Sequence, residues 1–552
     1  MDVIILTLVM LFAVVISGII SRVLPLPLPL PLIQIILGAG IAMTGYFSVR
    51  LDPHIFFLLF LPPLLFVDGW RISKQKVLQD KWTILEMALG LVFFTVVGMG
   101  FFIHWLIPAM PLVVAFALAA VLSPTDPVAV SAIAARVPIP KRLMHILEGE
   151  SLLNDASGLV CLRFAIAAAI TGSFSLLEAS QAFVWLAFAG IACGVGVTAG
   201  VVSAKKFIAR HFGEESGTQV LVSLLIPFAS YLVAEHIGGS GILAAVASGV
   251  TMSYAEASGR ALAVTRIHRN VVWDTLQFTA NGIVFILLGE QFPLIVRGAV
   301  KLVRDTGHEH VWWLVLYVLI ITVMLVVLRF LWVWASVRFT MMKAAKNGEQ
   351  RPPTPLRMVA VMSVAGVRGA ITLAGIMTLP LLMPDGTNFP ARDLAIFLAG
   401  GVIIMSLLIA TFLLPPLLKG VSESMPDQGK RSYEMRARNA AAWAAIRAIE
   451  KEQYKMAEGR SDADLYAGIA ARVMDDYRHR VDNNLKTTQE REDVLRMDEI
   501  ERNFRLVGLR HERDEVFRMA RANQIGDDLM RKLVRELDLQ ETREMHEMSK
   551  AH

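Results

Sequence analysis

The chain has 552 residues, of which 55% are hydrophobic and only 18% are charged, and its mean hydropathy is +0.55. This composition excludes an ordinary soluble enzyme and is typical of a polytopic membrane protein. The net charge of +5 does not indicate nucleic-acid binding, because the polar C-terminal part is nearly neutral and has no basic stripe interleaved with aromatic residues.

Long apolar runs recur as far as Leu418, and about thirteen of them approach the length that a helix needs to cross a bilayer. They are predicted at 3–24, 32–48, 53–69, 84–106, 112–135, 145–171, 181–205, 218–236, 240–255, 271–290, 312–336, 358–382 and 392–418. After Lys419 the chain becomes rich in charges of both signs and contains no run long enough to span. We therefore expect an all-α transmembrane domain over residues 1–420 and a soluble helical tail over residues 421–552.

The loops between these segments alternate in charge. Those after odd-numbered segments carry most of the basic residues, namely Arg22, Arg71, Lys74, Lys76, Lys81, Arg136, Lys141, Arg142, Lys205, Lys206, Arg210, Arg260, Arg266, Arg269, Arg338, Lys343, Lys346, Arg351 and Arg357. The positive-inside rule makes these loops cytoplasmic. The sequence thus predicts a multi-pass protein of a bacterial-type inner membrane, with its N-terminus outside and its tail in the cytoplasm.

Two of the predicted segments are interrupted by helix-breaking residues. The fifth contains Ser123-Pro-Thr-Asp-Pro127, and the twelfth contains Ala365-Gly-Val-Arg-Gly369. Prolines remove backbone donors and leave carbonyls free. Broken helices at matching positions in two halves point to the central site of a secondary transporter. With segments 1–6 and 8–13 as the halves, the sequence predicts two inverted six-helix repeats.

The sixth segment carries acidic residues in an otherwise apolar stretch. An ionised carboxylate near the bilayer centre costs about 2.5 to 3.5 kcal/mol, so it calls for a functional reason. Glu148, Ser151 and Asp155 are spaced i, i+3, i+7 and lie on one helix face, with Asn154 at its edge. Carboxylate, amide and hydroxyl oxygens suit a small cation such as Na⁺. A desolvated carboxylate can hold a proton instead. Asp155 is therefore the candidate to bind Na⁺ or H⁺ alternately.

Thr125 and Asp126 precede Pro127 in the break of the fifth segment. Because proline is favoured as the first residue of a helix, Asp126 is a candidate N-cap for the second half of this segment. It is equally a candidate ion ligand, and the two roles are compatible. Carbonyls freed around Thr125 could also bind the ion.

Arg368 lies between two glycines at membrane depth and needs an acidic partner. We expect Glu148 to form a structural salt bridge with it, and Glu150 is the alternative. Arg163 and Arg329 also lie within predicted spans, where they could snorkel or pair with acids. The sequence assigns no partner to either of them.

Asp68 follows the run Leu61-Pro-Pro-Leu-Leu-Phe-Val and is next to Gly69, Trp70 and Arg71. At the cytoplasmic end of the third segment it could line the entrance for cations. It could also simply lie at the membrane interface.

Other classes of function find little support. Both cysteines, Cys161 and Cys193, fall inside apolar segments, so neither a disulfide nor a zinc site is expected. We find no Walker A loop, no Gly-x-Ser-x-Gly motif and no His-Glu-x-x-His motif. An aspartyl intramembrane protease would need a Gly-x-Gly-Asp type context, which is absent. We therefore expect no catalytic activity and no cofactor besides the transported ions.

Three motifs together, SPTDPVAV, EGESLLNDASGLV and GVRGAITLAG, resemble those of the monovalent cation:proton antiporter-1 family of sodium/proton exchangers, and the resemblance covers about residues 1–420. It implies that Asp155 is the alternating carrier of cation and proton, that Asn154, Thr125, Asp126 and Ser151 lie at or beside the ion site, and that Glu148 pairs with Arg368. It also implies a homodimer in the membrane lipid. In many relatives an acid occupies the position of Val67 and not that of Asp68. The resemblance therefore assigns no role to Asp68.

The resulting prediction is a secondary antiporter that exchanges Na⁺, or alternatively Li⁺ or K⁺, for H⁺ by alternating access. The resemblance implies electroneutral exchange, because Asn154 stands where electrogenic relatives carry a second aspartate. The main alternative is a cation channel or uniporter that moves no protons.

Overall fold

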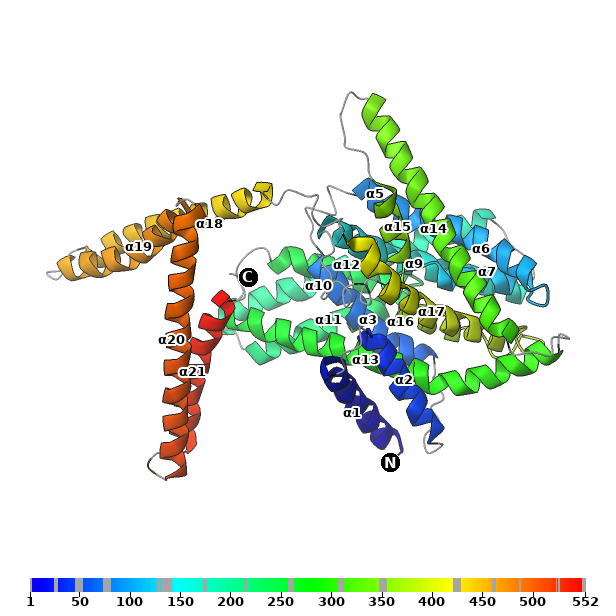
Figure 1. Ribbon diagram of the computed structural model, residues 1–552, viewed down its shortest axis with the longest axis horizontal. Helices are drawn as coiled ribbons and strands as arrows, with labels where there is room; N and C mark the ends of the chain where they lie inside the picture. The colour runs from blue at the N-terminus through cyan, green and yellow to red at the C-terminus, as the bar shows by residue number, and fades with distance from the viewer. Residues whose placement is uncertain are drawn as a thin grey trace. The chain divides into compact units, whose positions relative to one another are not determined.

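The computed structural model describes residues 2–23, 28–44, 53–72, 81–126, 130, 141–171, 176–212, 216–256, 263–305, 312–346, 355–419, 428–458, 463–485, 488–522, 524 and 527–548. Apart from an isolated β-bridge between Leu382 and Asn388, the regular elements within these residues are helices (Figure 1). The predicted all-α class is confirmed. The chain divides into two compact units, Met1–Ser424 and Met425–His552.

The helices of the first unit overlap the predicted apolar segments, and several extend well beyond them. They are α1 (Asp2–Val23), α2 (Leu30–Met43), α3 (Pro53–Arg71), α5 (Lys81–Leu85), the π-helix η1 (Glu86–Leu91), α6 (Val92–Leu106), α7 (Leu112–Leu122), α9 (Lys141–Thr171), α10 (Leu176–Phe212), α11 (Ser216–His236), α12 (Gly241–Glu256), α13 (Ala263–Asp305), α14 (Trp312–Lys346), α15 (Leu356–Val364), α16 (Ala370–Met377) and α17 (Arg392–Leu418).

Eight of the described helical stretches are long and apolar enough to cross a membrane. They are Ile4–Val23, Trp82–Leu106, Leu143–Thr171, Ser180–Ile208, Gly217–His236, Thr265–Pro293, Trp312–Phe339 and Arg392–Leu418, and Leu30–Met43 and Leu112–Leu122 are shorter apolar helices. The full number of thirteen crossings stays a prediction.

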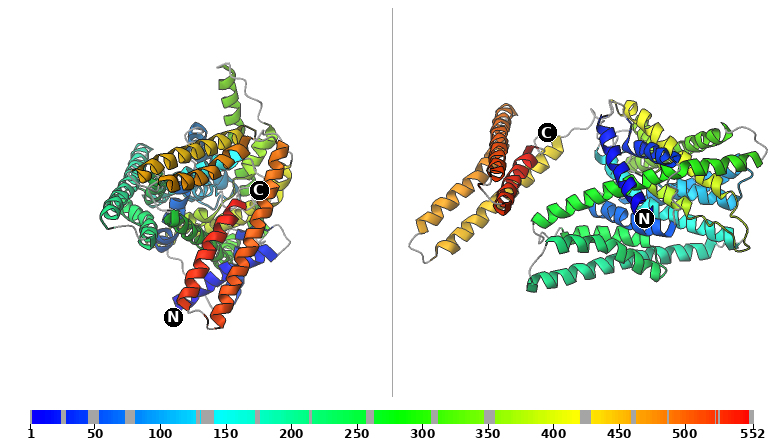
Figure 2. Two further views of the ribbon diagram at one scale, coloured as in Figure 1. Left: turned by 90° about the vertical axis from the view of Figure 1, so that its left-hand side faces the viewer. Right: turned by 90° about the horizontal axis from the view of Figure 1, so that it is seen from below.

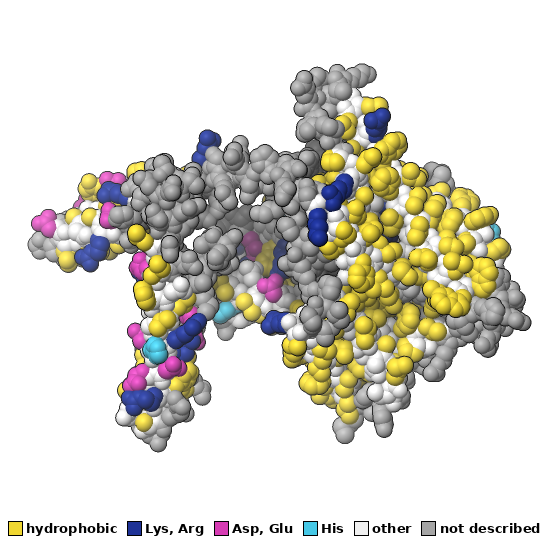
Figure 3. Space-filling model, in the orientation of Figure 1, with side chains coloured by type: hydrophobic (Ala, Val, Ile, Leu, Met, Phe, Trp, Pro, Cys, Tyr) yellow, Lys and Arg dark blue, Asp and Glu magenta, His cyan; other side chains and the backbone are white. Residues whose placement is uncertain are grey.

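Hydrophobic side chains cover much of the visible surface of the first unit (Figure 3). On α14, for example, Trp312, Val315, Leu319 and Val323 are all exposed. A soluble protein does not leave apolar patches of this extent in water. Such a surface is suited to contact with lipid.

Close backbone contacts hold α2 against α13 and α3 against α12. A β-carbon at Gly38 of α2 would overlap the carbonyl group of Ile286, and one at Gly289 of α13 would overlap that of Ile35. A β-carbon at Gly69 of α3 would likewise overlap the carbonyl oxygen of Val246 in α12. Small residues allow helices in lipid to pack this tightly. We call α2, α3, α12 and α13 the glycine-packed helices.

The tail unit consists of two helical hairpins (Figure 2). In the first, α18 (Gln428–Ala457) packs on α19 (Ala463–Leu485) around Ile446 and Met474. In the second, α20 (Thr488–Arg521) packs on α21 (Asp527–Met548), and Arg513 of α20 bonds to Glu541 of α21.

Candidate functional site

Two interrupted helices cross near the middle of the first unit. Helix α7 ends at Leu122, and the chain continues without helical structure to Asp126. In the second interruption, α15 ends at Val364 and α16 begins at Ala370. The backbone N–H of Asp126 donates to the carbonyl oxygen of Val367 at 2.7 Å. The two interruptions that the sequence predicts therefore meet in space. Pro127 lies outside the described residues, so the predicted N-cap role of Asp126 concerns a helix start that is not described.

Arg368 binds the backbone of both interrupted segments. Its Nε donates to the carbonyl oxygen of Leu122 at 2.9 Å, and its Nη1 donates to the carbonyl oxygen of Gly366. Carbonyls at a helix C-terminus lack partners within the helix and carry partial negative charge. The end of α7 and the turn after α15 thus supply acceptors for this buried guanidinium.

The prediction that Glu148 forms a salt bridge with Arg368 was wrong. The Glu148 carboxylate lies 3.4 Å from Nδ1 of His145, and its side chain is 44% exposed. The prediction assumed that a buried guanidinium requires a carboxylate. It overlooked the main-chain acceptors that a broken helix provides.

Glu150 instead forms the buried ion pair of this region, and its partner is Arg329 of α14. Two parallel hydrogen bonds of 2.5 and 2.7 Å join the guanidinium to the carboxylate. The two side chains are only 2% and 1% exposed. The Nε of Arg329 also donates to the carbonyl oxygen of Met362 in α15. This bidentate pair therefore ties α9, α14 and α15 together.

Asn154 lies on the same face of α9 as Glu150, one turn along the helix. Its Nδ2 donates to Oγ1 of Thr125 at 3.1 Å, and that hydroxyl donates to Glu150 at 3.2 Å. Asn154 does not line the cavity described below. The structure thus places it behind Thr125 and beside the cavity, whereas the resemblance implied a position at or beside the ion site.

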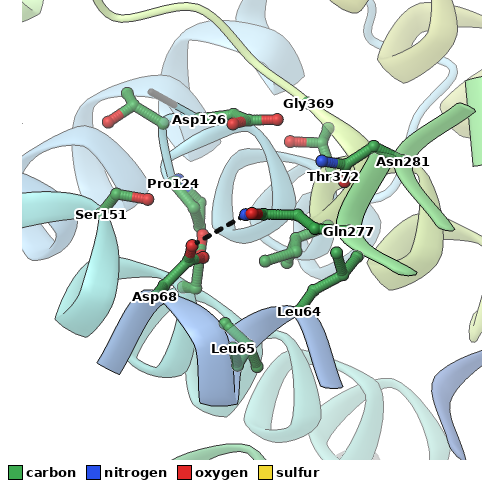
Figure 4. A pocket seen from close by; sticks show the side chains of 13 residues that line it. Leu64, Leu65, Asp68, Pro124, Asp126, Ser151, Gln277, Asn281, Gly369 and Thr372 are labelled. Carbon is green, nitrogen blue, oxygen red and sulfur yellow. Dashed lines mark hydrogen bonds between the residues drawn. The ribbon is translucent and has the colours of Figure 1, made fainter. Parts of the chain in front are cut away.

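A small cavity of about 30 Å³ opens beside the crossing (Figure 4). Its walls come from α3, the segment after α7, α9, α13 and α16, through Leu64, Leu65, Asp68, Pro124, Thr125, Asp126, Ser151, Asp155, Gln277, Asn281, Gly369, Ile371 and Thr372. Five residues predicted to be at the site or its entrance are therefore brought together: Asp68, Thr125, Asp126, Ser151 and Asp155.

Ser151 and Asp155 are one turn apart on α9, so both side chains face the cavity. Asp155 is 5% exposed. Within the described part of the chain, its carboxylate makes no hydrogen bond or ion pair. An oxygen-rich cavity of this size has room for about one water molecule. It suits a small cation that has lost most of its hydration shell, with carboxylate and hydroxyl oxygens as ligands.

Sequence reasoning missed the contribution of α13, which supplies Gln277 and Asn281 to the cavity. Asp274, Gln277 and Asn281 are spaced i, i+3, i+7, as are Glu148, Ser151 and Asp155 on α9. A polar stripe with helical period inside an apolar span was the available signal. Thr372 of α16, which follows the second interruption, was missed as well.

Comparison with known proteins identifies the family. The family model described as "Sodium/hydrogen exchanger, transmembrane" matches residues 9–420. The chain is 41% identical to the uncharacterized Na⁺/H⁺ exchanger YjcE of Escherichia coli (strain K12), over 98% of both chains. It is 43% identical to a sodium, potassium, lithium and rubidium/H⁺ antiporter of Bacillus subtilis (strain 168), over 76% of this chain and 62% of that protein.

Among solved structures, the fold resembles that of the sodium proton antiporter MjNhaP1 from Methanocaldococcus jannaschii. The TM-score is 0.58 at 16% sequence identity, and the match covers 76% of this chain and 99% of that one. At this identity the likeness concerns the fold alone. Together with the family match over most of the chain, these findings settle the classification: the chain belongs to the sodium/hydrogen exchanger family of transmembrane transporters.

Proposed function

We propose that this protein exchanges Na⁺ for H⁺ as a secondary antiporter, with Asp155 as the group that binds either the cation or the proton. The observation that carries the proposal is the position of Asp155. Its carboxylate faces a small cavity beside two crossed helix interruptions, together with the hydroxyl of Ser151. A buried carboxylate that must be either paired with a cation or protonated couples the two fluxes.

The other oxygen atoms of the cavity complete the proposed cation site. Thr125 and Asp126 come from the segment after α7, and Ser151 comes from α9. Asn154 supports Thr125 by a hydrogen bond and does not itself contact the ion in this proposal. In this proposal the buried Glu150–Arg329 pair holds the helices in place.

The cation range of the proposal includes Li⁺ and K⁺. The Bacillus subtilis relative is named a sodium, potassium, lithium and rubidium/H⁺ antiporter. Carboxylate and hydroxyl ligands accept any of these monovalent ions, and the size of the cavity decides among them. We propose Na⁺ as the main substrate, in keeping with the family.

The proposal further includes electroneutral, one-for-one exchange by alternating access. Asn154 carries no charge and leaves Asp155 as the only carboxylate at the Asn-Asp position. The charge pattern of the loops supports a cytoplasmic tail and an external N-terminus in a cell membrane. We also propose that the protein works as a homodimer, which cross-linking in native membranes would test.

Reconstituted protein tests the function directly. Proteoliposomes that contain a trapped pH dye are exposed in turn to Na⁺, Li⁺ and K⁺ at a series of pH values. Antiport predicts that each transported cation drives proton movement in the opposite direction, and electroneutral antiport predicts that an imposed membrane potential leaves the rate unchanged. Cation flux without any pH change would instead identify a channel or uniporter.

A further inference from the structure

The side chain of Gln277 reaches across the cavity from α13 to the carboxylate of Asp68 on α3 (Figure 4). Its Nε2 lies 3.4 Å from Oδ1 of Asp68. On its other side, its Oε1 accepts a hydrogen bond of 3.0 Å from Nη1 of Arg71. The amide thus bridges a guanidinium outside the cavity and a carboxylate that lines it.

Arg71 fixes which end of this amide faces the cavity. A guanidinium group can only donate hydrogen bonds, so the atom turned toward it must be the amide oxygen. The NH₂ group must then point toward Asp68. Arg71 is itself held by Asp274, one turn before Gln277 on α13, through a hydrogen bond of 2.5 Å.

Aromatic packing next to these residues holds α3 and α13 at a fixed distance. Phe66 of α3 stacks on Trp273 of α13, with ring centroids 5.0 Å apart. Phe66 and Trp273 are both fully buried. They lie within about one turn of Asp68 and Gln277, respectively, so they set the distance between the two polar side chains.

An NH₂ group cannot ligate a cation, because it offers protons and no lone pair. Directed at a carboxylate, it occupies an acceptor that a cation could otherwise use. The distance of 3.4 Å is long for a hydrogen bond, so the bond is weak and an arriving cation can displace it.

We propose that Gln277 acts as a place-holder for the cation at Asp68, and that Arg71 orients it for this purpose. Gln277 competes with the cation for Asp68 and so weakens cation binding at this wall of the cavity. Asp68 is then a further carboxylate that the cation contacts, besides Asp155. This inference rests on the proposed cation/proton exchange and adds a determinant of cation affinity to it.

The test compares the apparent KM for Na⁺ and the maximal rate of exchange in proteoliposomes. Gln277→Met keeps the length of the side chain and removes the competing donor, so KM should fall by about two- to tenfold, the effect expected from loss of one weak hydrogen bond to a charged group. A higher KM would mean that the amide serves as a ligand, and an unchanged KM would mean a purely structural role. Either result overturns the proposal.

A double-mutant cycle tests the orienting role of Arg71. Arg71→Met should also lower KM, because the amide can then turn its oxygen toward the cavity. If Arg71 acts through Gln277, the double variant Arg71→Met/Gln277→Met should bind Na⁺ no more tightly than Gln277→Met alone. Additive effects would show that Arg71 acts only through its charge, which overturns this part of the proposal.

Gln291→Met is the matched control. Gln291 is on the same helix, and its Nε2 also donates to a carboxylate, that of Glu290 at 2.6 Å, but it does not line the cavity. Its replacement should leave the KM for Na⁺ unchanged. Melting temperatures of all variants check folding. If Gln277→Met does not fold, Gln277→Leu, which also lacks the NH₂ donor and adds no charge, must lower KM in its place.

The outcomes also separate this inference from the proposed function. If the wild-type protein shows no cation-dependent proton movement, the proposed function fails before any variant is compared. If the wild type exchanges ions and Gln277→Met leaves its KM unchanged, the exchanger stands and only the place-holder role is lost.

Discussion

The backbone N–H of Asp126 donates a hydrogen bond of 2.7 Å to the carbonyl oxygen of Val367, which is more than 200 positions further along the chain. This bond joins the non-helical segments that follow α7 and α15. Arg368 strengthens the same junction by binding the carbonyl oxygen of Leu122. The cavity with Asp155 lies beside this junction, so its shape depends on main-chain contacts between the two interruptions.

Asp155→Asn should abolish cation-driven proton movement in proteoliposomes. The amide has nearly the same shape but can neither take up a proton nor balance the charge of a bound cation. The variant should still insert and fold, since the described structure shows no hydrogen bond that depends on the Asp155 carboxylate. Exchange at the wild-type rate in this variant would refute the proposed mechanism.

Replacing either member of the Glu150–Arg329 pair should destabilise the protein by about 3 to 5 kcal/mol, because the other charge is left buried without its partner. Glu150→Gln and Arg329→Met are suitable changes, and thermal unfolding in detergent measures their effect. Glu148→Gln is the control: its side chain is 44% exposed, and the melting temperature should change little. An equal loss of stability in the control would contradict the assignment of the pair.

Gly369→Ala should inactivate the protein. A β-carbon at Gly369 would overlap the carboxylate of Asp126, so either the cavity or the junction of the two interruptions must deform. Gly196→Ala on α10 is a control of the same chemistry, because a β-carbon there has no other atom within 4 Å. Exchange rates and melting temperatures of the two variants should differ clearly. A fully active Gly369→Ala would show that the junction tolerates displacement.

The turn between α16 and α17 should lose its protection against amide hydrogen exchange in acid. Thr387 donates to Oδ1 of Asp385 through its hydroxyl at 2.6 Å and its N–H at 2.9 Å. These bonds hold the pKa of Asp385 below its ordinary value of 3.8. Their stabilising effect is therefore fully present above that value and is lost as the pH falls through the lowered pKa. Hydrogen exchange at Thr387, corrected for its intrinsic pH dependence, should show this loss in the wild type and not in Asp385→Ala.

Much of the fold follows from the sequence because length and hydropathy decide whether a helix can reside in a bilayer. The apolar run at 392–418, for example, coincides with α17. The interruptions at Ser123 and Ala365 were also recognisable, since proline and glycine act locally on the backbone.

Partners that are distant in sequence could not be predicted in the same way. Glu150 and Arg329 are 179 positions apart, and nothing local to Arg329 identifies its partner. Arg368 was assigned to Glu148 because the sequence does not reveal where the free carbonyls of another helix end will lie. Gln277 was overlooked because the polar stripe of Asp274, Gln277 and Asn281 does not reveal which residues it faces until the opposite wall of the cavity is known.

The glycine-packed helices have a further consequence. Asp68 and Gln277 belong to helices of this set, whereas Asp155 belongs to α9, which is outside it, and the cavity lies between them. Any sliding of α9 relative to α3 and α13 therefore changes the separation of the two acidic walls. Ion binding in the cavity and the relative position of these helices are then coupled. If a movement of α9 lowers the affinity for the ion by some factor, the bound ion disfavours that movement by the same factor. The transported cation is in this sense also an effector of the protein that carries it.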